Sequence, residues 1–114
     1  MSKYIWKNTP CHEQALAAIR EHLYNQYACD AVAETTESAA GLRVDVLVCD
    51  KHFFRVGNRV SLTVIVATSR ESTRVTAIGS GGSASLLSRF DWGAEEDFAS
   101  ELERTLAPMG FREG

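Results

Sequence analysis

The chain has 114 residues, which suits a single domain spanning residues 1–114, since compact domains commonly hold about 100–150 residues. Its 45% hydrophobic and 24% charged residues are typical of a soluble globular protein, and two prolines and eight glycines are too few for a disordered or collagen-like chain. A net charge of −3 argues against nucleic acid as a partner, because nucleic-acid binders cluster Lys and Arg to neutralise phosphates.

The N-terminal segment predicts a strand followed by a helix. Residues 2–7 alternate weakly between two sets of side chains, as in a short strand. Thr9 and Pro10 then supply an N-cap hydroxyl and a residue whose φ already suits the first helical turn. Apolar residues repeat at helical spacing over residues 10–27, so one face of this helix is expected to be buried.

The middle of the chain predicts a series of antiparallel strands. Residues 30–38 mix Ala and acidic residues, a composition that favours a strand at a sheet edge, and residues 39–41 suggest the turn after it. Two runs rich in β-branched residues, 42–54 and 60–68, flank the loop at residues 56–58 and indicate a hairpin.

The C-terminal half adds a further strand and a second helix. Residues 73–79 form a third β-branched run and lead into the glycine-rich segment 79–83. Apolar side chains at helical spacing predict an amphipathic helix over residues 93–107, which ends near Pro108 and Gly110. The expected order is therefore β-α-β-β-β-β-α: an α+β, two-layer domain with an antiparallel sheet and both helices on one face.

The topology resembles the TATA-box-binding-protein-like, or helix-grip, architecture, which implies a cavity between the sheet and the C-terminal helix. A second resemblance is carried by residues 57–64, 80–83 and 92–98, which look like segments of a family of short bacterial proteins classed only as a domain of unknown function. This resemblance covers about residues 57–98. It implies a bacterial, cytosolic origin and carries no catalytic residues to this chain.

Strand parity predicts which side chains share the core. The valines of the first β-run are expected to share a face with the apolar residues of the next strand, as a three-residue loop gives by pairing Arg55 with Arg59. The members of this set are Val44, Val46, Val48, Val60, Leu62, Val64 and Val66. The following hairpin pairs Thr68 with Thr73 and adds Val75, Ala77 and Gly79 to the core face.

This register predicts two polar residues on the core face, Asp50 beside Val64 and His52 beside Leu62. In one interpretation the imidazole and the carboxylate form a general-base pair at the mouth of a pocket. In the other they lie beyond the edge of the core, where they are solvated or hydrogen-bond to each other.

The glycine-rich segment is a candidate anion site formed by backbone N–H groups, with Gly81, Gly82 and Ser83 as its residues. It lacks the Lys and Ser/Thr ending of a P-loop, and its glycine spacing differs from the dinucleotide fingerprint. The alternative is a flexible or tightly packed connection.

Cysteine and histidine spacing predicts no metal and no cofactor. Cys11, Cys29 and Cys49 are separated by 18 and 20 residues, which fits neither a disulfide framework nor a CxxC zinc pattern, so a reducing cytoplasm is expected. Cys11 lies beside His12 in the predicted first helical turn, where a thiol can become reactive, although no second cysteine completes a redox motif.

The outer face of the predicted sheet collects apolar residues that no predicted helix covers. The candidate interaction residues are Leu47, Cys49, Phe53, Ile65 and Ile78. A patch of this kind indicates a partner contact, and a homodimer through the sheet or a partly tucked terminus would cover it. Lys3 and Lys7 interrupt the N-terminal segment, so no signal peptide is expected. The longest apolar stretch, around residues 64–67, is far shorter than the roughly 20 residues that a membrane-spanning helix needs.

Two functions remain open on the sequence alone. The first is a non-enzymatic binding domain, which either encloses a small apolar ligand between sheet and helix or associates through its outer face with itself or another protein. The second is a small hydrolase or transferase that uses His52 and Asp50 as base and orienting group near residues 79–83.

Overall fold

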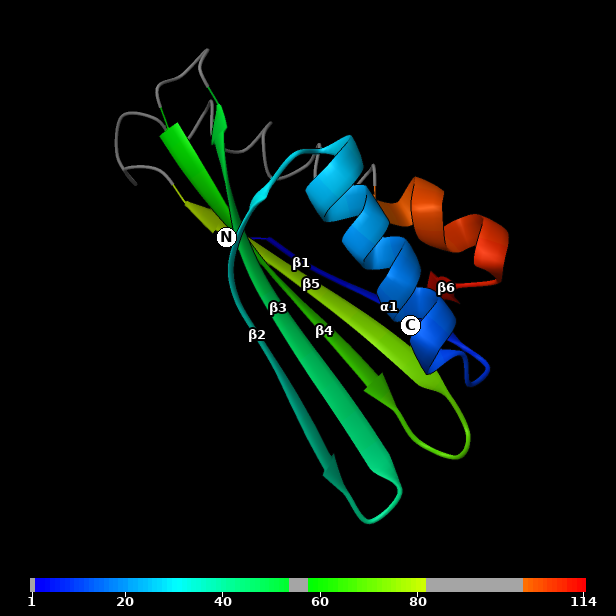
Figure 1. Cartoon of the computed structure of the whole chain (residues 1–114). Coiled ribbons are helices and arrows are strands. Elements are labelled where there is room, and N and C mark those ends of the chain that lie inside the picture. The colour runs from blue at the N-terminus through cyan, green and yellow to red at the C-terminus, as the bar shows by residue number, and fades with distance from the viewer. Residues whose placement is uncertain (1, 54–57, 82–101) are drawn as a thin grey trace.

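A six-stranded antiparallel sheet carries helices on one of its faces in the computed structural model, which describes residues 2–53, 58–81 and 102–114 (Figure 1). The strand order is β2-β3-β4-β5-β1-β6. The α+β class and the antiparallel sheet are confirmed. The strands are β1 (Ser2–Asn8), β2 (Asp30–Ala39), β3 (Leu42–Phe53), β4 (Asn58–Thr68), β5 (Thr73–Gly81) and β6 (Arg112–Glu113).

The first helix starts two residues later than predicted. It comprises the α-helix α1 (His12–Arg20) and the π-helix η1 (Glu21–Gln26) that continues it. Thr9 does not cap it: Cys11 occupies the N-cap position without a side-chain cap. The reason is that the Thr9 N–H donates to the Asn8 side chain at 2.8 Å, which ties this residue to the end of β1 instead.

The C-terminal segment packs on the same face of the sheet as α1 (Figure 1). Residues 102–106 are helical and continue into the short turn η2 (Ala107–Met109), as the prediction for this end of the 93–107 helix required. The remainder of that predicted helix lies outside the described residues. The strand β6 was not predicted, and it pairs with β1 at the sheet edge.

The core fills the space between this helical layer and the sheet. Burial of apolar area at about 25 cal/mol per Å² is the main stabilising term for such a layer. Its fully or nearly fully buried members are Trp6, Ala15, Leu16, Ile19, Leu23, Cys29, Leu47, Cys49, Val60, Leu62, Val64, Val66, Val75, Ala77, Leu102, Leu106 and Phe111.

Two of the predicted turns are confirmed. Thr68 pairs with Thr73, so the β4–β5 hairpin has the expected register. The turn between β2 and β3 consists of Ala40 and Gly41, whose φ angles of 50° and 81° are both positive. Positive φ at both central residues is typical of the turn that matches strand twist, and β2 lies at the sheet edge as its composition indicated.

The predicted register of β3 against β4 is wrong. Phe53 pairs with Asn58, and Val64 lies opposite Leu47, so alternate residues of β3 exchange faces relative to the prediction. Leu47 and Cys49 are fully buried in the core, whereas the three valines of β3 lie on the outer face. The prediction placed these valines in the core because of their apolar character. The observed register instead buries Asp45, and hydrogen bonds and ion pairs to that carboxylate offset the cost of its burial.

The register can be tested with two neighbouring residues of β3. Leu47→Ala removes a fully buried side chain and should lower the free energy of unfolding by about 2–5 kcal/mol. Val46→Ala, on the outer face, should cost clearly less. Urea unfolding followed by circular dichroism measures both, and a larger loss for Val46→Ala would contradict the observed register.

Candidate functional site

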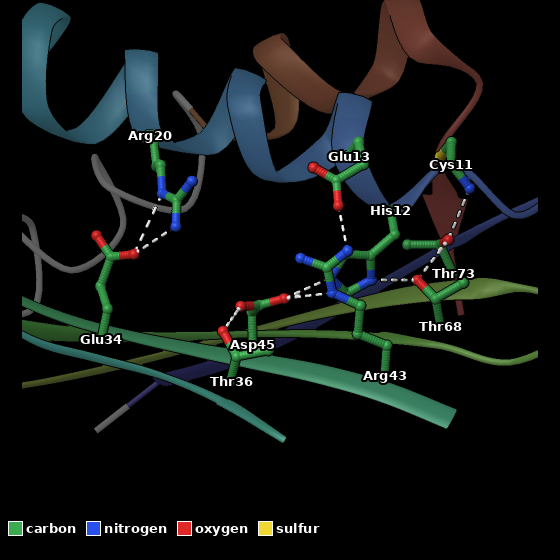
Figure 2. Close-up of polar contacts among 10 residues, drawn as sticks. All are labelled: Cys11, His12, Glu13, Arg20, Glu34, Thr36, Arg43, Asp45, Thr68 and Thr73. Carbon is green, nitrogen blue, oxygen red and sulfur yellow. Dashed lines mark hydrogen bonds and ion pairs between the residues drawn. The ribbon is translucent and has the colours of Figure 1, made fainter. Parts of the chain in front are cut away.

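The chemically most distinctive cluster lies between the start of α1 and the middle of the sheet (Figure 2). His12 Nε2 is 2.5 Å from Asp45 Oδ2, and His12 Nδ1 is 2.6 Å from Thr68 Oγ1. His12 is 8% exposed and Asp45 is 3% exposed. Thr73 is fully buried, and its Oγ1 is 2.9 Å from Thr68 Oγ1. A carboxylate, an imidazole and a hydroxyl are therefore joined in series, shielded from solvent by the helix.

The direction of the hydrogen bonds in this cluster depends on whether the His12 imidazole is neutral or protonated. Nε2 donates to the Asp45 carboxylate, and the Cys11 N–H donates to Thr73 Oγ1 at 2.9 Å. With a neutral His12, Thr68 donates its proton to Nδ1 and accepts from Thr73. With a protonated His12, Nδ1 donates to Thr68, whose proton then points to Thr73. Each state keeps both ring nitrogens hydrogen-bonded.

The Asp45 carboxylate holds its charge despite its burial. Burial by itself would raise the pKa of Asp45, but hydrogen bonds from Thr36 and His12 and the charge of Arg43 outweigh it, so the pKa lies below its ordinary value. Arg43 Nε is 3.3 Å from Asp45 Oδ2, and Arg43 also pairs with Glu13 on α1. Residues of α1, β2 and β3 thus converge on one carboxylate.

A second polar contact ties the helix to the edge strand (Figure 2). Arg20 donates to Glu34 Oε1 through Nε at 3.1 Å and through Nη2 at 2.7 Å, and the Tyr24 hydroxyl donates to Glu34 Oε2 at 2.8 Å. Burial and the carboxylate of Glu34 raise the pKa of Tyr24 above its ordinary range. Exposed pairs of this kind stabilise little individually, but here they position β2, whose side chains are all exposed.

Asp50, the carboxylate of the predicted general-base pair, is not on the core face. Asp50 lies opposite Ser61 on the outer face, where its carboxylate is 3.8 Å from the Arg59 guanidinium. His52 lies opposite Arg59 in the backbone register. The expected positions beside Val64 and Leu62 are therefore wrong for both residues, for the same reason that the β3 register is wrong.

The other candidate residues fall into different regions. Gly81 ends β5, whereas Gly82 and Ser83 lie outside the described residues. Leu47 and Cys49 are core residues and not part of the outer patch, while Ile65 and Ile78 are partly exposed on the outer face as predicted. Phe53 is the last residue of β3. A surface pocket of about 330 Å³ lies at the β1–β6 edge, lined by Lys3, Tyr4, Ile5, Glu113 and Gly114.

Sequence reasoning did not find Asp45, although a signal was present. A single carboxylate in the middle of a valine-rich run is unusual for a strand buried on one side, because an unpaired charge there is costly. The pairing of Thr68 with Thr73 was predicted, so two members of the cluster could have been placed at one end of a hairpin. The helical residue that contacts these threonines depends on the residue at which the first helix begins, and that residue was not predicted correctly.

The chain belongs to a family of unknown function (DUF6054), whose model matches residues 1–110. The family description assigns no activity, which agrees with a resemblance to a domain of unknown function. No curated protein matches the chain. Among the helices of the described residues, none has the length and apolar character needed to cross a membrane. In the same part of the chain, no three His, Cys, Asp or Glu residues gather in a way that could hold a metal ion.

The Asp45 cluster predicts a specific loss of stability in acid. Because the pKa of Asp45 is lower in the folded chain, its stabilising effect is present above the ordinary carboxylate pKa of about 3.9 and disappears as the pH falls through the folded value. Asp45→Asn should cost about 1–3 kcal/mol at pH 7, and this cost should shrink as the pH is lowered from about 4 to 3. Urea unfolding across this pH range measures the change.

Asp50→Asn provides the control, because Asp50 is a partly exposed carboxylate on the same strand. Its effect should remain within about 0.5 kcal/mol at pH 7. A penalty for Asp45→Asn that stays constant between pH 7 and pH 3 would contradict the assignment of the acid dependence to this carboxylate.

Proposed function

We propose that this chain is a non-enzymatic interaction module that forms a homodimer through the outer face of its sheet. The observation that supports the proposal is an apolar band on the face opposite the helices, with opposite charges at its two edges. An uncovered apolar face of a sheet is a common site of protein association.

The band runs across the sheet and consists of partly exposed aliphatic side chains. In the described residues no helix lies over it (Figure 1). Val46 on β3, Ile65 on β4 and Thr76 on β5 are directly opposite one another in the strand register, and Ile5 on β1 completes the row. The aliphatic members are Ile5, Val44, Val46, Val48, Ile65, Ala67 and Ile78.

Charges at the two edges of this face differ in sign. The β2–β3 edge carries Asp30, Glu37 and Asp50, and Arg59 is 3.8 Å from two of these carboxylates. At the opposite edge, the charged side chains on this face are all basic. They are Lys3, Lys7, Arg74 and Arg112. Such a surface complements itself when one copy is turned over on the other, so a second copy of the chain fits it better than a partner of uniform charge.

The charge pattern also selects the symmetry of the dimer. A two-fold axis parallel to the strands and centred on β4 brings β2 of one copy over β1 of the other. Glu37 on β2 and Lys7 on β1 belong to one row of paired residues, each two strands away from β4, so each would face the other across the interface. Ile65 would meet its own copy on the axis, as aligned packing of two sheets permits. An axis across the strands would instead bring like charges together.

The apolar contact is tested with a charge at the centre of the face. Ile65→Lys places two ammonium groups against each other on the axis and should weaken dimerisation by about 100-fold or more. Native mass spectrometry and sedimentation velocity measure the subunit count. Val32→Lys is the matched control, since Val32 is 58% exposed in the irregular region of β2. A wild-type chain that remains monomeric at high concentration would overturn the proposal.

The symmetry is tested by exchanging one pair of charges. Lys7→Glu and Glu37→Lys should each weaken the dimer, because each creates a like-charge contact, and the double variant should regain affinity. The differences should shrink as salt is raised, since exposed charges are screened. Equal weakening by the singles with no recovery in the double variant would reject the axis along the strands.

A second candidate function rests on the order carboxylate, imidazole, hydroxyl in the Asp45–His12–Thr68 cluster. In a hydrolase, Thr68 Oγ1 would bond to an ester carbonyl carbon as its proton passes to His12 Nδ1, and the leaving alcohol would take that proton. Incubation with p-nitrophenyl acetate should then acetylate Thr68 in the wild type and not in His12→Ala. Thr63→Val, on the outer face, is the control. Absence of the adduct would remove this candidate.

A further inference from the structure

Two cysteines that are far apart in the sequence meet in the core. Cys29 follows η1 and precedes β2, and Cys49 lies on the core side of β3. Ala31, near the start of β2, is the register partner of Cys49, and Cys29, two residues before it, belongs to the same buried core cluster as Cys49. The two thiols hydrogen-bond to each other, and their residues are 8% and 0% exposed.

Backbone contacts hold Cys29 in this position. Its N–H donates to Leu23 O at 2.8 Å, and the Tyr27 N–H donates to His22 O at 2.9 Å, which closes the end of the helix. Between them Ala28 has a φ of 53°, which turns the chain from the helix into β2. The thiol of Cys29 is therefore placed against Cys49 by fixed main-chain geometry on both sides.

The two thiols differ in their surroundings. Lys51 lies on the same face of β3 as Cys49, donates to Tyr27 O and sits 5.4 Å from the Tyr27 ring centroid. The hydrogen bond with Cys49 and the nearby Lys51 charge lower the pKa of Cys29, although burial opposes them. The contact with Cys29 and burial raise the pKa of Cys49. Cys29 is also the more accessible of the two, 8% exposed against 0% for Cys49, which suits it to be the nucleophile.

We propose that Cys29 and Cys49 form a reversible redox pair that reacts with hydroperoxides. The Cys29 thiolate attacks one peroxide oxygen, the O–O bond breaks, and the leaving oxygen takes a proton to give an alcohol or water, leaving a sulfenic acid on Cys29. The Cys49 thiol then attacks the Cys29 sulfur, water leaves, and a disulfide forms. The peroxide is reduced, and the two thiols are oxidised together.

The product would fasten the start of the edge strand to the interior of the sheet. Because β2 contributes no buried residue of its own, a covalent link from Cys29 to β3 would limit its separation from the sheet. Disulfides in reducing compartments are commonly transient and responsive to oxidants. A small thiol such as dithiothreitol would restore the reduced pair by exchange.

Cys11 serves as an internal comparison. It is partly buried, its sulfur accepts a hydrogen bond from Asn8 Nδ2 at 3.5 Å, and it is the third free cysteine of the chain. Trypsin separates the three thiols, because cleavage after Lys7, Arg20, Arg43 and Lys51 puts each cysteine on a different peptide. The proposed disulfide would join peptide 21–43 to peptide 44–51.

The experiment treats the folded, reduced chain with hydrogen peroxide, stops the reaction with N-ethylmaleimide in denaturant, and counts labels by mass spectrometry. Wild type and Cys11→Ser should each lose two labels together, give the joined peptide, and recover both labels after dithiothreitol. Cys49→Ser should stop at a Cys29 sulfenic acid, which dimedone traps. Cys29→Ser should leave Cys49 labelled.

Several results would overturn the proposal. They are oxidation of Cys11 ahead of the pair, disulfides only between chains, or a joined peptide that appears only when peroxide is added after unfolding. Circular dichroism of each variant before treatment confirms that it is folded, and Cys49→Ala replaces Cys49→Ser if the buried hydroxyl prevents folding. The labelling pattern does not depend on the subunit count, so failure of the homodimer proposal leaves this test intact.

Discussion

The contact between the His12 imidazole and the Asp45 carboxylate joins the first turn of α1 to the middle of β3, in a place that water scarcely reaches. A carboxylate there costs several kcal/mol unless its charge is met by hydrogen bonds and a cation. His12, Thr36 and Arg43 supply them from three separate segments. Removing any one partner would leave the carboxylate undersatisfied, so the positions of α1 and of β2 are both linked to the face that β3 turns inward.

The choice of which face of β3 turns inward determines which side chains of the strand are buried and which are exposed. A strand has two faces, and a shift of one residue in pairing exchanges all of its side chains between them. With Asp45 inside, Leu47 and Cys49 follow it into the core, and the valines of β3 turn outward. Composition favours the opposite choice, because three valines are better core residues than one carboxylate, one leucine and one cysteine. The buried polar contacts reverse this preference.

The sequence therefore predicted those features that depend on neighbours along the chain. Thr68 opposite Thr73, the Ala40–Gly41 turn and the edge position of β2 all follow from short-range patterns, and all are found. The face of β3 depends on a histidine 33 residues earlier, which no local pattern identifies. The predicted start of the first helix was wrong for a related reason. The Thr9 N–H donates to the Asn8 side chain, and the Cys11 N–H donates to the hydroxyl of Thr73 on β5, which is far away in the sequence.

The candidate interaction surface and the candidate redox pair depend on this same register from opposite sides of the sheet. If β3 were shifted by one residue, Cys49 would leave the core and lose contact with Cys29, while Asp45 would interrupt the apolar row that now contains Val46 and Ile65. The buried polar cluster thus bears on both proposals indirectly, because it fixes which side chains of β3 face the core and which face outward. Specificity of this kind is a known use of buried charges, whose net contribution to stability is often small.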